Sequence, residues 1–214
     1  RIAVCSDADS WINITVPELI VSWLNQGYQV HWVHNADHLT MGEWCFFLSY
    51  SRIVPRSILG RHQRNLVVHA SDLPRGRGMS PLTWQILEGA DKIVLTLLEA
   101  EDAVDSGVIY LQTHLDLDGT ELLPELRNMV ARTTKALCIQ FIDGYPSVVA
   151  RAREQTGARS SLYRRRGPKD SQLDPFKSLE QQFNLLRVVD NERYPAWFEY
   201  RGRRYVLYIV PERQ

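Results

Sequence analysis

The sequence of 214 residues has few cysteines and no excess charge of either sign. Its three cysteines, Cys5, Cys45 and Cys138, are far apart and lie in apolar runs. Such a set forms neither a disulfide framework nor paired metal ligands, so we expect buried, reduced thiols and no metal site. The 25 basic side chains are balanced by 25 acidic ones. Nucleic acids and anionic membranes favour a basic excess, so we expect neither as a partner.

Long apolar runs and nucleotide-binding motifs are also missing. No run approaches the roughly 20 residues that span a bilayer. The sequence begins directly on a strand-like segment, with no visible signal peptide, so we expect a cytoplasmic protein. No Gly-x-Gly-x-x-Gly follows the first strand and no Walker sequence is present, which argues against the standard dinucleotide and P-loop sites.

Short apolar segments alternate with helical patterns up to about residue 145. This alternation predicts an open, mostly parallel, Rossmann-like α/β sheet with helices on both faces. Strands are expected at residues 1–5, 29–34, 44–49, 66–69, 93–98 and 106–114. Helices are expected at residues 17–26, 55–60, 80–88 and 121–142.

The composition changes after residue 150, where polar and basic residues become more frequent. A short helix is expected near residues 179–188. Two apolar segments, 197–200 and 205–209, flank Gly202 and predict a β-hairpin. We therefore expect a catalytic domain at 1–150 and a small α+β subdomain at 151–214.

Two titratable side chains follow apolar strands and are candidates for chemistry. His69 ends the strand at 66–69, and Asp105 follows the strand at 93–98. The carboxyl ends of parallel strands meet at one sheet edge, where the two side chains would lie together. A histidine there can exchange a proton near neutral pH. The structural alternatives are a buried histidine with satisfied nitrogens and an ordinary Asp-Ser-Gly turn.

The loop after His69 reads Arg75-Gly76-Arg77-Gly78. Successive glycines expose backbone N–H groups, and arginines add positive charge, so this loop is a candidate anion site. The alternative is a solvated turn.

Several motifs resemble those of one enzyme family. His-Ala-Ser-Asp-Leu-Pro-Arg-Gly-Arg-Gly, from His69 to Gly78, resembles the His-x-Ser-x-Leu-Pro…Gly signature of the folate-dependent formyltransferases. Val-Asp-Ser-Gly, from Val104 to Gly107, is similar to that family's Asp-Ser/Thr-Gly element. Tyr-Arg-Arg-Arg-Gly-Pro, which begins at Tyr163, and a later Tyr-Pro-Ala-Trp-Phe resemble the sugar N-formyltransferase branch, nearest to enzymes of the pseudaminic-acid type.

The resemblance implies a formyl transfer from 10-formyltetrahydrofolate to the amine of an amino sugar. The acceptor would be UDP-linked and belong to nonulosonic-acid, pseudaminic-acid or surface-glycan biosynthesis. His69 would act as base or polarise the formyl oxygen, and Asp105 would orient His69. The implied pterin contacts are Tyr50, Arg52, Ile53, Asp102 and Val104. The implied substrate contacts are Arg75, Gly76, Arg77, Gly78, Tyr163 and Arg164, with Arg165 and Arg166 as further clamps for a diphosphate.

Val67 departs from the family pattern, which has asparagine two residues before the histidine. Valine cannot donate a hydrogen bond to an oxyanion, and one lost donor costs about 3 kcal/mol of barrier. Asn65 lies on the same strand face, about 6.6 Å from Val67 in an extended strand, and is a candidate substitute. The choices are an active enzyme with a different donor, a slow enzyme, or a non-catalytic protein that binds folate or nucleotide sugar.

Other acceptors of the same family remain alternatives. Methionyl-tRNA formylation normally uses a larger, basic C-terminal domain than residues 151–214 provide. Glycinamide ribonucleotide is a second alternative. A homodimer is left open.

Overall fold

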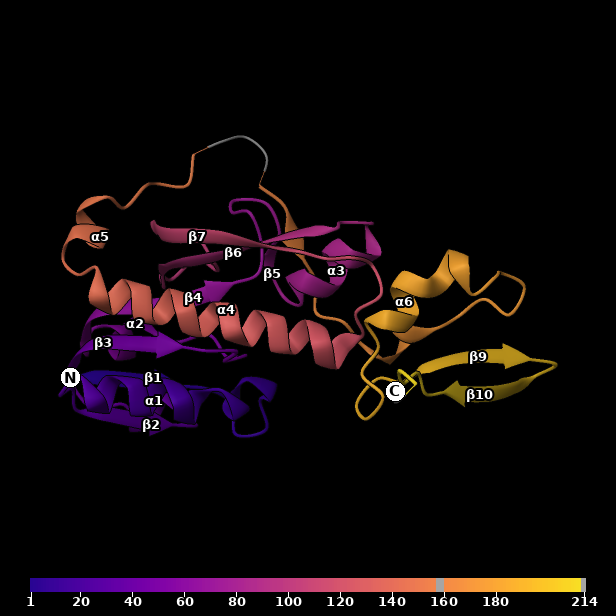
Figure 1. The fold of residues 1–214 in the computed structure, drawn as a ribbon, viewed down its shortest axis with the longest axis horizontal. Coiled ribbons are helices and arrows are strands. Elements are labelled where there is room, and N and C mark those ends of the chain that lie inside the picture. Colours follow the sequence, from indigo (N-terminus) through magenta and orange to yellow (C-terminus); the bar gives the residue numbers. More distant parts are fainter. Residues whose placement is uncertain (157–159, 213–214) are drawn as a thin grey trace.

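The computed structural model describes residues 1–156 and 160–212. A six-stranded sheet forms its centre, in the order β2-β1-β3-β4-β6-β7 (Figure 1). The strands are β1 (Ile2–Cys5), β2 (Val30–Val33), β3 (Gly42–Phe47), β4 (His62–His69), β6 (Lys92–Glu99) and β7 (Ile109–Asp116). The connecting helices are α1 (Val16–Asn25), α2 (Arg56–Leu59), α3 (Pro81–Leu87), α4 (Leu123–Asp143) and α5 (Ser147–Ala150).

The sheet is mostly parallel, which confirms the fold class expected from the sequence. Strands β2, β1, β3 and β4 pair in parallel, whereas β6 pairs antiparallel with both β4 and β7. Strand β6 therefore runs against the other five strands. Because of this reversal, the loop after β6 begins opposite Leu66 of β4 and not beside the carboxyl end of β4.

Helices α1 and α4 cover one face of the sheet and form the larger core with it. Trp23 of α1 and Phe141 of α4 are fully buried against Phe46 of β3. The other face has a smaller core, in which Cys5, Cys45 and Phe47 pack beneath α2 and the short 3₁₀ helix Ala36–His38. The three free thiols are buried, and burial raises the pKa of Cys5 to about 12.

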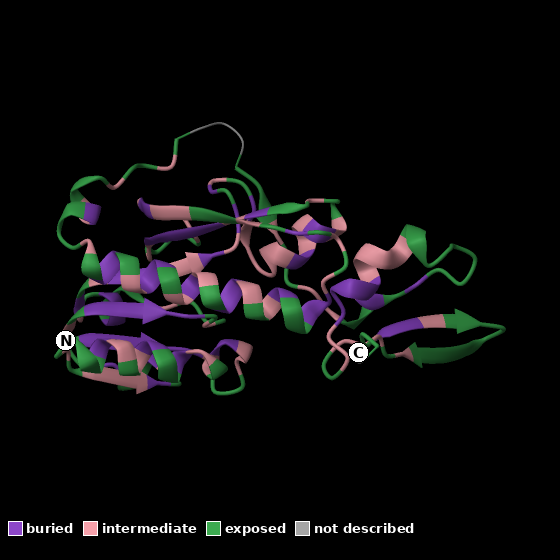
Figure 2. Ribbon diagram, viewed as in Figure 1, coloured by how far each residue is buried: buried purple, intermediate pink, exposed green. Residues whose placement is uncertain are grey.

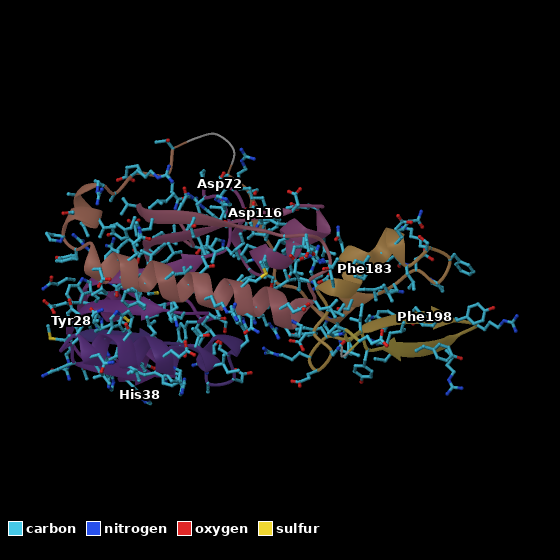
Figure 3. All side chains as sticks on the ribbon, viewed as in Figure 1. Tyr28, His38, Asp72, Asp116, Phe183 and Phe198 are labelled. Atoms are coloured by element: carbon cyan, nitrogen blue, oxygen red, sulfur yellow. The ribbon has the colours of Figure 1, made fainter. Side chains whose placement is uncertain are left out.

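The C-terminal residues form a small unit beyond the N-terminal end of α4 (Figure 1). It contains α6 (Phe183–Arg187) and a hairpin of β9 (Ala196–Tyr200) and β10 (Arg203–Leu207). Its core is built from Leu173, Leu186, Val189 and Ala196. Phe183 and Phe198, labelled in Figure 3, pack against this core from α6 and β9. Much of the hairpin is exposed (Figure 2).

The C-terminal unit contacts the start of α4, and part of residues 151–214 lies outside it. Buried Arg187 of α6 donates to the backbone oxygen of Glu121 at 3.0 Å and pairs with its carboxylate, which ties the unit to the start of α4. The short strand β8 (Leu162–Tyr163) instead pairs with β5 (Arg77–Gly78), next to the main sheet. The domain boundary near residue 150 therefore stays a prediction. Across residues 1–156 and 160–212, no helix combines the length and apolar character needed to cross a membrane.

Candidate active site

A cavity of about 550 Å³ lies at the carboxyl ends of the parallel strands. Its wall includes Asp7 after β1, Tyr50 after β3, and His69 at the end of β4. Open α/β sheets bind ligands at this edge, because loops of successive strands diverge there. The volume suits a ligand of small-molecule size.

His69 is 7% exposed, lines this cavity, and has both ring nitrogens directed at protein acceptors. Its Nε2 lies 2.7 Å from the carbonyl oxygen of Gly76, which can only accept, so Nε2 carries a hydrogen. Its Nδ1 lies 3.5 Å from Oδ2 of Asp105. The ring is therefore fixed in orientation, and its second proton position faces a carboxylate.

Asp105 also lines the cavity, and its backbone has a φ of 51°, in the left-handed region. Its Oδ2 accepts the N–H of Gly78 at 2.8 Å, in addition to facing His69. Its backbone oxygen accepts from Nε2 of Gln155 at 2.8 Å. Oδ1 takes part in none of these contacts.

The two side chains meet as expected, but not for the reason that a parallel sheet supplies. Because β6 is antiparallel to β4, Glu99 at its end pairs with Leu66 rather than with the end of β4. Residues 100–108 then turn back along the sheet, and Asp105 reaches His69 from this loop. Gly107 passes so close to Glu99 that a Cβ there would lie 2.1 Å from its carbonyl oxygen.

The backbone N–H groups of Gly76 and Gly78, which were expected to hold an anion, donate to protein acceptors in this structure. The N–H of Gly76 donates to Oγ of Ser161 at 2.8 Å, and the N–H of Gly78 donates to Asp105. A Cβ at Gly78 would lie 2.4 Å from the carbonyl oxygen of Tyr163, so glycine is needed for close contact with β8. The loop contacts His69 through the carbonyl of Gly76 and Asp105 through the N–H of Gly78.

Most of the other substrate contacts expected from the sequence lie outside the cavity wall. Arg75 is exposed, Arg77 donates to Gln155 at 2.6 Å, and Tyr163 donates to Glu88 at 2.6 Å. Arg164 stacks on Trp84, 4.8 Å from the ring centre, and pairs with Asp170. Of the residues in this group, only Gly78 lines the cavity.

Asn65 does not replace the missing family asparagine. Its amide nitrogen donates to the carbonyl oxygen of Leu59 at 2.9 Å, and it lies outside the cavity wall. Val67 and Val68 do line the cavity, and Val67 is half-buried between the smaller core beneath α2 and a buried cluster of Leu73, Leu98 and Ile109. The position where the family has a donor is therefore apolar in this chain.

The residues expected to contact a pterin all line the cavity: Tyr50, Arg52, Ile53, Asp102 and Val104. Glu99 lines it too and was not anticipated. Burial raises the pKa of Glu99, although hydrogen bonds from Tyr110 and from the N–H of Asn65 partly offset this. Nothing in the sequence around Glu99, at the end of an apolar strand, indicates that it lines a cavity or accepts hydrogen bonds from Tyr110 and Asn65.

Four arginines line the cavity on the side of α4 and the C-terminal unit: Arg127, Arg165, Arg166 and Arg193. Arg127 pairs with Asp190 at 2.7 Å, and burial lowers the pKa of Arg166. Burial alone would raise the pKa of Asp190, but its hydrogen bonds from Arg127 and from the N–H groups of Arg193 and Glu192 lower it. The sequence indicated Arg165 and Arg166 through their basic run, whereas Arg127 and Arg193 were not anticipated.

Within residues 1–156 and 160–212, no group of three histidine, cysteine, aspartate or glutamate side chains is placed to hold a metal ion.

Comparisons with solved structures agree with this architecture. A methionyl-tRNA formyltransferase from Clostridium thermocellum superposes with a TM-score of 0.77 and 24% identity, covering 99% of this chain and 93% of that one. A sugar N-formyltransferase from a Shewanella species gives a TM-score of 0.68 at 14% identity, covering 100% and 98%. HypX from Aquifex aeolicus, solved with tetrahydrofolic acid, gives 0.76 at 14%, covering 98% and 37%. These likenesses establish the fold.

Sequence comparisons find methionyl-tRNA formyltransferases among the relatives. The protein from Desulfotalea psychrophila is 25% identical over 165 residues, which are 77% of this chain and 50% of that one. The protein from Prochlorococcus marinus is 30% identical over 184 residues, 86% of this chain and 47% of that one. The chain thus spans about half the length of these curated relatives. The family model described as Formyl transferase matches residues 26–142, more than half of the sequence, and the chain belongs to the formyl transferase family.

Proposed function

We propose that the chain transfers a formyl group from 10-formyltetrahydrofolate to the amine of an amino sugar. The observation that carries this proposal is the His69–Asp105 pair, fixed at the wall of a cavity on the sheet edge. A carboxylate beside a histidine can accept a proton from an attacking amine and return it to a leaving group.

In the proposed mechanism, the acceptor nitrogen attacks the formyl carbon and forms a tetrahedral oxyanion. Asp105 accepts the proton that the nitrogen loses, because its Oδ1 is uncommitted while Nε2 of His69 is bound to Gly76. His69 shares this proton through Nδ1, which faces Oδ2. Collapse of the oxyanion breaks the bond to N10 of the folate. The proton then moves to that nitrogen, leaving a formamide and tetrahydrofolate.

The folate would lie along the loops that contain Tyr50, Arg52 and Ile53 and along residues 100–105, all in the cavity wall. This side of the cavity combines an aromatic ring, an apolar side chain and an arginine. Such a surface matches a flat pterin with a polar edge and a tail that carries carboxylates. Val67 and Leu98 add apolar contacts at the base.

The acceptor would enter from the opposite side, beside Arg127, Arg165, Arg166 and Arg193. Acidic neighbours offset part of this charge, since Arg127 pairs with Asp190 and Arg193 lies 3.6 Å from Asp9. On this side of the cavity four arginines face two aspartates, Asp9 and Asp190, and the local excess of positive charge favours an anionic acceptor. A guanidinium group can bind two phosphate oxygens at once. A nucleotide-linked amino sugar, UDP-linked by resemblance, supplies an amine and a diphosphate in one molecule.

Methionyl-tRNA is a second candidate acceptor, favoured by the names of the curated relatives. Those relatives extend well beyond the part that this chain matches. The length of residues 151–214 therefore carries no weight in choosing between the two acceptors. The arginine side of the cavity suits the phosphates of either molecule.

The test is a coupled assay of tetrahydrofolate formation with purified protein. UDP-linked amino sugars, free amino sugars and methionyl-tRNA are offered separately, and the formylated product is identified by mass spectrometry. We expect tetrahydrofolate to be released only with a nucleotide-linked amino sugar. Release with methionyl-tRNA alone would transfer the assignment to that acceptor. Folate binding without release in any arm would favour the non-catalytic alternative that Val67 suggests.

A further inference from the structure

We propose that Gln155 is a positioning residue for Asp105 and that its side-chain amide holds together the two loops of the reaction site. This inference rests on the proposed function for its kinetic consequence. Gln155 lies outside the cavity wall and beyond the residues that the family model matches. Any influence on the reaction must therefore pass through other groups.

The amide of Gln155 uses both of its ends. Its Nε2 donates to the backbone oxygens of Asp105 and Gly107, each at 2.8 Å. Its Oε1 accepts from Nη2 of Arg77 at 2.6 Å and from Nε at 3.2 Å. One half-buried side chain thus joins the loop after β6 to the loop after β4.

These contacts complete a closed ring of interactions. Gln155 holds the carbonyl of Asp105, the carboxylate of Asp105 accepts from the N–H of Gly78, and Gly78 is covalently next to Arg77, which returns to Gln155. The same loop supplies the carbonyl of Gly76 that orients His69. Both members of the catalytic pair are therefore fixed relative to one another through the ring.

Asp105 needs such support because its φ of 51° is unfavourable for a residue with a side chain. Without a partner for its carbonyl, the loop can relax and carry the carboxylate away from His69. A displacement of about 1 Å in a reacting group can cost about 100-fold in rate. The amide of Gln155, which donates to that carbonyl, therefore keeps the Asp105 carboxylate in position beside His69.

The experiment compares Gln155→Glu and Gln155→Met with wild type in the coupled assay. A glutamate keeps the size and the contact with Arg77 but cannot donate to the two backbone oxygens. We expect both variants to lower kcat by 10- to 100-fold, with KM for either substrate changed less than threefold. Hydrogen exchange at the N–H of Gly78 should accelerate in both, because its acceptor moves.

Gln182→Met is the matched control. Gln182 also donates to backbone oxygens, those of Asp174, Lys177 and Ser178, but in the C-terminal unit away from the cavity. We expect wild-type kcat and wild-type exchange at Gly78.

Wild-type kcat in Gln155→Glu would overturn the proposal, since the carbonyl contacts would then be dispensable. A rise in KM with unchanged kcat would also overturn it. If the wild-type protein releases no tetrahydrofolate with any acceptor, the proposed function fails separately. The exchange at Gly78 then decides the positioning role alone, and unchanged protection in both Gln155 variants would refute it.

Discussion

The end of the cavity that contains His69 and Asp105, here called the reaction end, and the C-terminal hairpin are stabilised by contacts over very different distances along the chain. In the hairpin, Tyr200 pairs with Arg203 and Phe198 with Tyr205, around a two-residue turn. At the reaction end, Gly78 and Asp105 are 27 positions apart, and Gly76 and Ser161 are 85 apart. Local interactions build the first region, whereas the second exists only when distant segments have come together.

This difference determines how far the effect of a substitution spreads in each region. A change in the hairpin affects its immediate neighbours, and loop-closure entropy there is small. A change at the reaction end disturbs segments from both halves of the chain. We therefore expect the two regions to respond independently to substitution, with function sensitive mainly at the reaction end.

The largest effect is expected from Asp105→Asn. The amide oxygen can still accept from the N–H of Gly78, but the group can no longer take a proton from the acceptor amine. We expect kcat to fall by about 10²- to 10⁴-fold, the usual contribution of a positioned acid or base, with the unfolding midpoint little changed.

Asp143→Asn, at the end of α4 and outside the cavity wall, is the control for this loss of charge and should keep wild-type kcat. Residual activity of Asp105→Asn within a factor of two of wild type would show that another group carries the proton.

Leu186→Ala tests the independence of the C-terminal unit. Leu186 is 5% exposed in the small core, so its truncation leaves a cavity that costs about 2–5 kcal/mol. Hydrogen exchange should accelerate in β9 and β10 while β4 keeps its protection.

Leu179→Ala, 66% exposed in the same unit, should change neither. Equal acceleration of exchange in β4 would mean that both regions open as one cooperative unit, and the comparison would fail.

Val67→Asn would place an amide donor at the position where the family pattern has one. Val67 lines the cavity two residues before His69. A donor directed at a developing oxyanion is worth up to about 10²–10³ in rate, and we expect at least a 10-fold rise in kcat.

Burial of the new amide should lower the unfolding midpoint at the same time. Val67→Ala, which removes the valine without adding a donor, should not raise kcat. A fall in kcat for Val67→Asn would indicate that the oxyanion forms elsewhere in the cavity.

The smallest effect is expected from Asp170→Asn in the C-terminal unit. The hydrogen bond from Arg164 lowers the pKa of Asp170 from 3.8 to about 2. A carboxyl group with a lowered pKa stabilises the fold above its ordinary pKa, and this stabilisation is lost as the pH falls toward the folded value.

The variant should therefore be less stable than wild type at pH 7, and the difference should shrink as the pH falls from about 4 toward 2. Denaturant titrations across that range provide the measurement. Asp116→Asn, whose side chain is 76% exposed, should show little difference at any pH. A constant difference for Asp170→Asn would assign its role to packing rather than charge.

The two regions also differ in how far sequence predicts structure. The hairpin follows from alternating side chains and Gly202, and Arg201 and Gly202 have the positive φ values, 49° and 76°, that a tight hairpin turn requires. The α/β fold and the positions of its helices and strands follow from periodicity in the same way. The hairpin pairs and the periodic patterns of the helices and strands lie within a few residues, whereas the pairing of the strands into the sheet joins distant segments.

The site could be predicted only in part. His69 and Asp105 were found because their motifs are local, yet the direction of β6, which determines how they meet, has no local signal. Gly76 and Gly78 were interpreted as an anion loop because the segment that they contact, β8, lies far along the chain and could not be identified from the local sequence. Gln155 and Arg127 were missed for the same reason. The partner of Gln155, Asp105, is 50 positions away in the sequence, and the partner of Arg127, Asp190, is 63 positions away.

Backbone strain is concentrated around the cavity. Among the described residues, the non-glycine positions with positive φ are Ser49, Ser80, Asp105 and Arg201, and the first three line the cavity. Each such conformation costs about 1–2 kcal/mol, so the wall of the cavity holds most of the strain at non-glycine positions among the described residues. Substitutions that relax this backbone would favour a more heat-resistant chain. Selection for durability and selection for turnover therefore act in opposite directions at these positions, and variants evolved for thermal tolerance should accumulate changes at Ser49 and Ser80 before Asp105.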